Sequence, residues 1–292
     1  MVKPEDNNNT ESSTSSLNQN ITKPAWITLA ILGSTILIAM YGETMLLPAI
    51  PDIIRDFDIS YSDSSWILSA YLISGAVATP IFGKLSDIYG RKKMVMIILI
   101  IYIVGIFSGG ISSDFTFLVI SRVIQGIGIS MFPIAFGIIR DQLPKDKLSV
   151  GVGIFSSMFA AGSVVGLGLG ASIIENFGWR ATFFSIVPVA IGLWFVIRRF
   201  IRDSPISNLS ETNVSVTKEE EAVANYSDNN IARDNKNSSS TNSLDIKGTI
   251  TLAITITSFL LIFSYSETGN LIDSPLIIVL LSVGTISLFL FI

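Results

Sequence analysis

A short basic turn between two long apolar runs constrains this chain more than any other feature. The turn covers Gly83 to Lys93, and its sequence is Gly-Lys-Leu-Ser-Asp-Ile-Tyr-Gly-Arg-Lys-Lys. The apolar run before it ends at Phe82, and the next one begins at Met94. Two membrane-length helices joined by so short a loop must pair as an antiparallel hairpin. Its basic end is expected on the cytoplasmic side of a membrane.

The composition agrees with a helical membrane protein. Hydrophobic residues make up 49% of the chain and charged residues only 14%, whereas a soluble domain carries about a quarter charged residues. The charges are segregated, so that apolar blocks of roughly twenty residues, the length that spans a bilayer, alternate with polar stretches. The ten-residue alternation of a transmembrane barrel is not seen in the sequence. We therefore predict an all-α membrane protein.

The chain contains no cysteine and no histidine. This excludes disulfides, thiol chemistry and the common zinc motifs, and it removes the side chain that usually transfers protons near neutral pH. Any proton handling must therefore fall to carboxylates. The sequence shows neither a nucleotide-binding glycine loop nor a nucleophile–base pair. We expect no cofactor, no metal and no nucleic-acid partner, and we do not expect an enzyme.

The alternation of apolar and polar stretches divides the chain into four parts. Residues 1–24 are predicted to form a disordered cytoplasmic tail, residues 25–200 a six-helix bundle, residues 201–246 a disordered cytoplasmic linker and residues 247–292 two additional transmembrane helices. The predicted spans cover about 25–49, 64–83, 93–111, 115–139, 148–173, 180–199, 247–265 and 275–292.

The distribution of Lys and Arg sets the predicted orientation. The loops placed on the outside carry only Arg55 and Arg180, and the first of them is acidic. The loops and ends placed on the cytoplasmic side carry Lys84, Arg91, Lys92, Lys93, Arg140, Lys145, Lys147, Arg198, Arg199 and Arg202. This bias predicts a multi-pass protein of the cell membrane with a cytoplasmic N-terminus.

The basic turn carries a motif as well as a charge. Its pattern Gly-x-Leu-x-Asp-x-x-Gly-Arg-Lys-Lys resembles the loop between the second and third helices of major facilitator superfamily transporters. The resemblance implies a cytoplasmic gate formed by Gly83, Asp87, Gly90 and Arg91. The two glycines permit unusual backbone angles at the helix ends, and Asp87 can pair with a helix N-terminus or a nearby Arg. The alternative is that the turn only sets topology, and the family often has Arg where this chain has Ile88.

The fourth span carries Arg122-Val-Ile-Gln125-Gly126-Ile-Gly128. An Arg within a membrane span is costly, so Arg122 should face the bundle interior and have partners. Gln125 lies on the same helical face, and Gly126 lets a neighbouring helix pack closely. The motif resembles the family's fourth-helix pattern, whose Arg is implicated in proton coupling. The alternative is a structural Arg that extends to the membrane surface.

Glu43 is the only carboxylate well within an apolar span, in the sequence Tyr41-Gly-Glu-Thr-Met-Leu-Leu-Pro48. It could load and release a proton as access alternates, or attract a cationic compound. The drug:proton antiporters of the family often have an acid at this point, just before Leu-Pro. We expect Glu43 to face the central cavity; the alternative is a position near the outer mouth. Aromatic residues such as Trp66, Tyr71 and Phe136 could also line a cavity.

Glycines recur every four residues in the fifth span, at Gly162, Gly166 and Gly170. They share one helix face and should let the helix press against a partner. The stretch resembles the antiporter pattern Gly-Pro-x-x-Gly-Gly, but Leu167 replaces the Pro and Ala171 replaces the last Gly. The expected kink of this helix is therefore in doubt.

The resemblance is dense over about 25–200 and implies the N-terminal half of a family member, followed by two helices as in the fourteen-helix branch. Complete members have twelve or fourteen spans, so the C-terminal half is predicted to be absent from this chain. The resemblance favours proton-coupled efflux of small molecules, with protons and a small-molecule substrate as ligands. The alternatives are a metabolite symporter for an organic acid or sugar, and a non-transporting membrane subunit that partners a missing half or a second copy.

Overall fold

The computed structural model describes residues 23–144, 147–201, 248, 251, 254–259, 261–262 and 275–291. The predicted tail before Lys23, the predicted linker after Ile201 and nearly half of the seventh predicted span lie outside these residues. The described part contains helices and no strand, and six of its helical segments are long and apolar enough to cross a membrane. The predicted all-α membrane fold is therefore confirmed.

Several of the membrane-length segments are composed of more than one helix. The first consists of α2 (Lys23–Thr44), the 3-10 turn η3 (Leu47–Ala49) and α3 (Ile50–Phe57). The second consists of α4 (Tyr61–Ser64) and α5 (Trp66–Tyr89), and the fourth of α7 (Phe115–Gly126), η4 (Ile127–Ser130) and α8 (Met131–Gln142). The third, fifth and sixth are single helices: α6 (Arg91–Gly110), α9 (Leu148–Phe177) and α10 (Trp179–Phe200).

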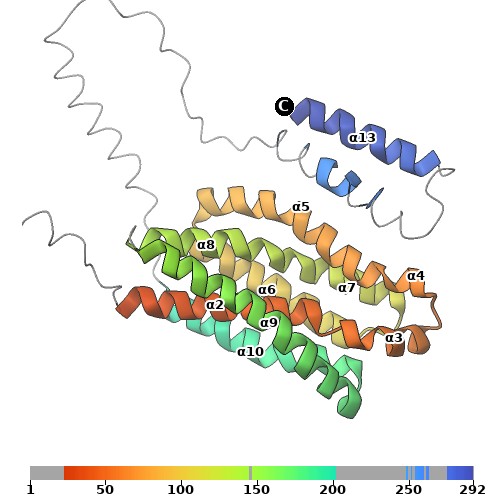
Figure 1. The fold of residues 1–292 in the computed structure, drawn as a ribbon, viewed down its shortest axis with the longest axis horizontal. Coiled ribbons are helices and arrows are strands. Elements are labelled where there is room, and N and C mark those ends of the chain that lie inside the picture. The colour runs from red at the N-terminus through yellow and green to blue at the C-terminus, as the bar shows by residue number, and fades with distance from the viewer. Residues whose placement is uncertain are drawn as a thin grey trace, which may run out of the picture.

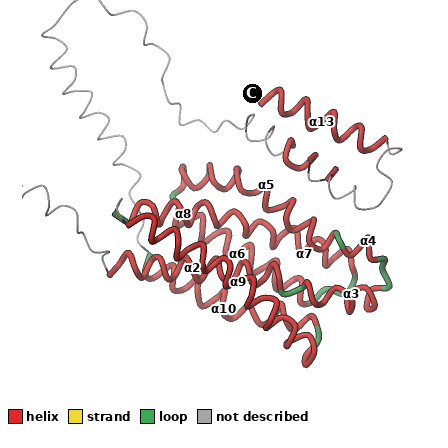
Figure 2. The backbone as a smooth tube through the Cα atoms, viewed as in Figure 1, coloured by secondary structure: helices red, strands yellow, loops and turns green. Residues whose placement is uncertain are grey.

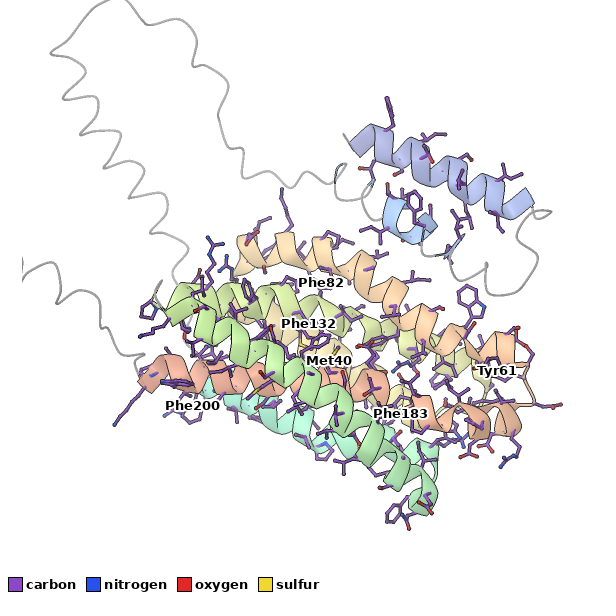
Figure 3. All side chains as sticks on the ribbon, viewed as in Figure 1. Met40, Tyr61, Phe82, Phe132, Phe183 and Phe200 are labelled. Atoms are coloured by element: carbon purple, nitrogen blue, oxygen red, sulfur yellow. The ribbon has the colours of Figure 1, made fainter. Side chains whose placement is uncertain are left out.

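These segments form an antiparallel bundle with short connections at its two ends (Figures 1 and 2). We call the two ends of the bundle the Gly90 end and the Gly178 end, after the glycine that lies in a turn at each end. Helix α9 crosses α2, while α6 packs against both α7 and α10, and α5 packs against α7. Met40 lies where α2 and α9 cross, with Phe200 at one end of the bundle and Tyr61 towards the other (Figure 3).

The helix ends have local causes in the sequence. Gly90 and Gly178 end their helices with φ values of +95° and +80°, which side chains with a Cβ rarely adopt. Asp58 closes α3 in the left-handed region. Asp114 caps α7 by accepting a hydrogen bond from the Phe117 backbone, and Ser60 forms a capping box at the start of α4.

The basic turn is much shorter than the sequence predicted. Helix α5 continues to Tyr89 and α6 starts at Arg91, so that Gly90 alone joins them. The prediction of unusual backbone angles was right for Gly90 and wrong for Gly83, which lies inside α5 with helical angles. Polar side chains near a helix end do not stop the helix, because its backbone hydrogen bonds continue until a residue leaves helical geometry.

The two glycines of this turn should respond in opposite ways to alanine. Gly90→Ala forces a Cβ into a strained backbone conformation and is expected to cost about 1–3 kcal/mol of folding free energy. Gly83→Ala meets no atom within 4 Å and should be neutral, or stabilise the helix by up to about 1 kcal/mol. Thermal unfolding of both purified variants measures the difference. An unchanged midpoint for Gly90→Ala would contradict the assignment of the turn to this one residue.

The last described helix is α13 (Pro275–Phe291), within the range of the eighth predicted span. The Ser287 hydroxyl donates to the Thr251 carbonyl oxygen over 2.7 Å, and a methyl group on Gly284 would lie 3.1 Å from Cβ of Ser258. Helix α13 therefore packs against the described helical residues between 251 and 262. That these two segments cross the membrane stays a prediction.

Candidate functional site

Arg122 lies at the centre of the bundle and is completely buried. Its Nε donates to the Ile67 carbonyl oxygen on α5 over 3.1 Å, and its Nη1 donates to the Gly42 carbonyl oxygen on α2 over 3.1 Å. Nη1 also donates to Oε1 of Gln125, one turn further along α7, over 2.5 Å. The prediction that Arg122 faces the interior with partners, and shares a face with Gln125, is therefore confirmed.

A break in α2 explains why Arg122 binds a backbone carbonyl there. Helix α2 ends at Thr44, and Met45 still donates to the Tyr41 carbonyl oxygen. The next bond of the series, from Leu46 to Gly42, is not formed. The last carbonyls of a helix need other donors, and Arg122 supplies one for Gly42. One guanidinium thus joins the interrupted first segment to α5 and α7.

Two tyrosines complete the surroundings of this guanidinium. The Tyr71 ring on α5 lies 4.5 Å from Cζ of Arg122 and stacks on it as a cation–π pair. The Tyr102 hydroxyl on α6 donates to the Ile38 carbonyl oxygen over 3.0 Å. A methyl group on Gly42 would meet the Tyr102 hydroxyl and would lie 3.0 Å from Nε2 of Gln125. Four helices therefore meet here, and the absence of a side chain at Gly42 allows them to.

Glu43 follows Gly42 directly and is only half-buried. It interacts electrostatically with Arg122 and with both buried tyrosines. Among the described ion pairs, none joins Glu43 or any other carboxylate to Arg122. The structure therefore brings Glu43, Arg122 and Gln125 into one neighbourhood, with the acid beside the guanidinium rather than bound to it.

The glycines of α9 contact α2 close to Glu43. Methyl groups on Gly162 and Gly170 would lie 2.5 Å and 2.8 Å from the carbonyl oxygens of Leu37 and Met45, and one on Gly166 would lie 2.9 Å from that of Tyr41. All three glycines are buried. The prediction that they press against a partner helix is confirmed, and the partner is α2. Helix α9 runs unbroken through the position where the antiporter pattern has proline.

At the Gly90 end, Arg91 lies between two acids. Its Nη1 bonds Oδ2 of Asp141 in the last turn of α8, and its Nη2 lies 3.9 Å from Oδ1 of Asp87 in the last turn of α5. The guanidinium also covers Gly137, where a methyl group would lie 3.0 Å from Cζ of Arg91. The predicted pairing of Asp87 with a nearby Arg is found, although it is the longer of the two contacts.

At the Gly178 end, a second polar cluster joins three segments. Asp56 on α3 accepts hydrogen bonds from Nε1 of Trp179 over 2.8 Å and from Nη1 of Arg180 over 3.2 Å. Nη2 of Arg180 donates to the Ser112 carbonyl oxygen over 3.2 Å, and the guanidinium lies 4.1 Å from the Trp179 ring centroid. This cluster holds α3 against the start of α10 and the turn before α7.

Comparison with known proteins decides the family. The Major Facilitator Superfamily model matches residues 32–292. The chain belongs to the major facilitator superfamily. The resemblance carried by the turn and by the Arg122 motif is thereby confirmed.

Curated relatives include transporters with named roles. The chain is 36% identical over 167 residues to Multidrug resistance protein 3 of Bacillus subtilis (strain 168), a match that covers 56% of this chain and 32% of that protein. It is 31% identical over 167 residues to the tetracenomycin C resistance and export protein of Streptomyces glaucescens, covering 57% of this chain and 31% of the relative. The matched stretch therefore spans about a third of the length of these relatives.

The fold also matches solved members of the superfamily. The structure aligns with the crystal structure of the human organic anion transporter MFSD10 with a TM-score of 0.55. The sequences are 18% identical, and the alignment covers 62% of this chain and 49% of the human protein. At this identity the likeness concerns the fold alone.

Sequence reasoning missed several residues of these clusters. Asp56 entered the sequence prediction only as one of the acids of the first outside loop, and Asp141 did not enter it at all. Nothing in the local sequence shows that α3 faces α10 or that α8 ends beside Arg91. Tyr102 gave no signal at all. Tyr71 had a signal as a possible lining aromatic, but the sequence does not show that it would stack on Arg122.

Proposed function

We propose that this superfamily member is a proton-coupled exporter of amphipathic or cationic small molecules that works by alternating access. The observation that carries this proposal is the buried guanidinium of Arg122, held at the carbonyl oxygen of Gly42, the residue before Glu43. An acid beside a buried cation can be ionised at moderate cost, and a half-exposed acid can exchange protons with water. The named roles of the curated relatives, multidrug resistance and export, support the direction of transport.

In this proposal Glu43 either carries the proton or attracts a cationic compound, so that the two ligands compete for one carboxylate. Arg122 biases the protonation of Glu43, and Gln125 fixes the guanidinium. The contacts between Arg91, Asp87 and Asp141 supply a latch at the Gly90 end. The excess of Lys and Arg near the Gly90 end supports a cytoplasmic location for that end of the bundle. The N-terminus would lie on the same side, and the protein would reside in the cell membrane.

The direction of a pH gradient tests this function against symport. We expect the purified protein in liposomes with an acidic lumen to accumulate the cationic dye ethidium and to dissipate the gradient, because lumenal protons leave as the dye enters. A metabolite symporter would instead accumulate an organic acid or a sugar when the external medium is the acidic side. Protein-free liposomes are the control. No substrate movement above that control in either gradient would contradict transport and favour a non-transporting membrane subunit.

A further inference from the structure

Three cations lie where α10 ends and α2 begins. Arg198 and Arg199 belong to the last turn of α10, and Lys23 is the first residue of α2. All three residues are exposed. Among the residues that the structure describes, no acid pairs with any of the three. Arg91, at the same end of the bundle, has two acidic partners instead.

The start of α2 and the end of α10 meet at the Gly90 end. The two helices are antiparallel neighbours, and the Tyr41 hydroxyl pairs with that of Ser185 over 3.0 Å. Counted from this pair, Ala25 lies as far along α2 as Ile201 lies beyond Ser185, so both helices reach the end together. Ala25 and Ile201 are buried in one hydrophobic core, and Figure 3 places Phe200 at the end of the bundle where α2 begins. The three cations therefore share one corner of the bundle.

Aromatic rings accompany these cations. The guanidinium of Arg198 lies 5.5 Å from the ring centroid of Trp194. That of Arg199 lies 5.6 Å from the ring centroid of Phe200. The residues Trp26 on α2 and Phe200 on α10 are 45% and 54% exposed. Rings of this kind at the ends of membrane helices favour the boundary between the hydrocarbon and the headgroups. The corner thus combines cations that lack acidic partners with exposed apolar surface at the depth of the lipid headgroups.

We propose that this corner, formed by Lys23, Trp26, Arg198, Arg199 and Phe200, is a docking surface for the headgroup of an anionic phospholipid. Guanidinium groups bind phosphate oxygens through paired hydrogen bonds, so the two arginines hold the phosphodiester. The Lys23 ammonium adds a point charge. The two exposed rings pack against the glycerol and the first acyl carbons, which a free phosphate ion does not have. A zwitterionic headgroup carries a cation of its own, which the corner repels, so anionic lipids are favoured.

A lipid bound at this corner would join two helices through charge. Among the described hydrogen bonds, the one between α2 and α10 lies in the interior of the bundle, at Tyr41 and Ser185. At the Gly90 end the two helices meet through apolar side chains such as Ala25 and Ile201. A phosphate held by both helices would therefore fasten their ends. This inference goes beyond the proposed function, because it requires a membrane at the Gly90 end and does not depend on transport.

Native mass spectrometry of the purified full chain in a neutral detergent tests the docking surface. The titrants are phosphatidylglycerol and phosphatidylcholine with identical acyl chains, and the unaltered protein should bind phosphatidylglycerol more tightly. Arg198→Gln combined with Arg199→Gln should weaken that binding roughly thirtyfold, since each cation near a headgroup contributes about fivefold. Binding of phosphatidylcholine should not change. Equal affinity of the unaltered protein for the two lipids, or undiminished phosphatidylglycerol binding by the double variant, would overturn the proposal.

Arg140→Gln is the matched control. Arg140 is exposed in the last turn of α8, at the same end of the bundle, and it makes none of the described cation–π contacts. Its variant should bind phosphatidylglycerol like the unaltered protein. An equal loss in this variant would mean that the net charge of the Gly90 end attracts the lipid, and it would overturn the assignment to the corner.

Two further measurements separate the docking surface from a folding defect and from a site for free phosphate. Arg198→Lys combined with Arg199→Lys keeps both charges, so it should bind phosphatidylglycerol more tightly than the glutamine variant. Equal weakness of the two variants would contradict a role of charge. Excess inorganic phosphate should leave the lipid bound, because it cannot replace the contacts of the acyl chains with the rings. Displacement of the lipid by phosphate would reject a lipid surface in favour of a site for the soluble ion.

Discussion

Glu43→Gln is expected to reduce pH-gradient-driven efflux to the level of protein-free liposomes while the protein still inserts and folds. Glutamine keeps the size and hydrogen-bonding capacity of glutamic acid but cannot carry a proton or a negative charge. Glu43 is half-buried and makes no ion pair among the described residues, so the substitution breaks no contact on which folding depends. The measurement is dye uptake into liposomes with an acidic lumen, with the protein amount equalised by quantitative labelling.

Glu175→Gln provides the matched control for this experiment. Glu175 is exposed near the end of α9, far along the chain from the Arg122 cluster, and its variant should transport like the unaltered protein. Export by Glu43→Gln at the unaltered rate would remove this carboxylate from the mechanism. Loss of folded protein in that variant alone would instead show that Glu43 has a structural role.

The helices of this fold could be predicted from the sequence because the bilayer imposes their length. Blocks of roughly twenty apolar residues, long enough to span a bilayer, must become helices in lipid, where every backbone group needs an internal partner. The boundaries were less predictable. Helix α5 passes the first polar residues of the turn and stops only at Gly90, and the first segment continues past its predicted end at about 49 as α3. Polarity marks where the membrane ends, whereas caps and glycines mark where the helix ends.

The site was predictable only where chemistry makes a residue unusual for its surroundings. An Arg and a Glu inside apolar spans are conspicuous in any sequence, and the structure brings Arg122 and Glu43 into one neighbourhood. Their partners are not conspicuous. Arg122 binds the backbone oxygens of Ile67 and Gly42, and a backbone carbonyl carries no mark in a sequence. Which carbonyl is free depends on where α2 breaks, and that is a property of the assembled bundle.

In the proposed alternating-access cycle, the polar cluster at the Gly178 end would fix one side of the break in the first segment. At the Gly178 end, Asp56 holds α3 to α10 through Trp179 and Arg180. The break between α2 and α3 lies inward of this anchor and next to Glu43. If α3 is fixed, a change in how α2 is held must be absorbed at the break. A short interruption beside a titratable residue is therefore well placed to act as a hinge.

Gly162→Leu should have the largest effect on folding of any single substitution considered, because α2 and α9 touch backbone to backbone at this point. A methyl group alone would lie 2.5 Å from the Leu37 carbonyl oxygen and 2.9 Å from its Cα. A backbone cannot move aside as a flexible side chain can, so the helices must separate and lose the close packing that joins them in lipid. Overpacking of this kind costs about 1–3 kcal/mol or more. Thermal unfolding in detergent and the yield of monodisperse protein measure the loss.

Gly168→Leu on the same helix is the matched control. Gly168 is exposed, and a methyl group there meets no atom within 4 Å, so leucine at this position points away from α2 and should raise helix propensity at no packing cost. The pair separates the effect of contact from the effect of removing a glycine. Similar losses in both variants would mean that α9 needs flexible backbone rather than a small-residue face, and an unaffected Gly162→Leu would contradict the close approach of α2.

The interface between α9 and α2 also holds α2 just before its break. Gly166→Ala is a milder change, and its methyl group meets the Tyr41 backbone. This substitution should therefore disturb the position of Glu43 before it disturbs the fold.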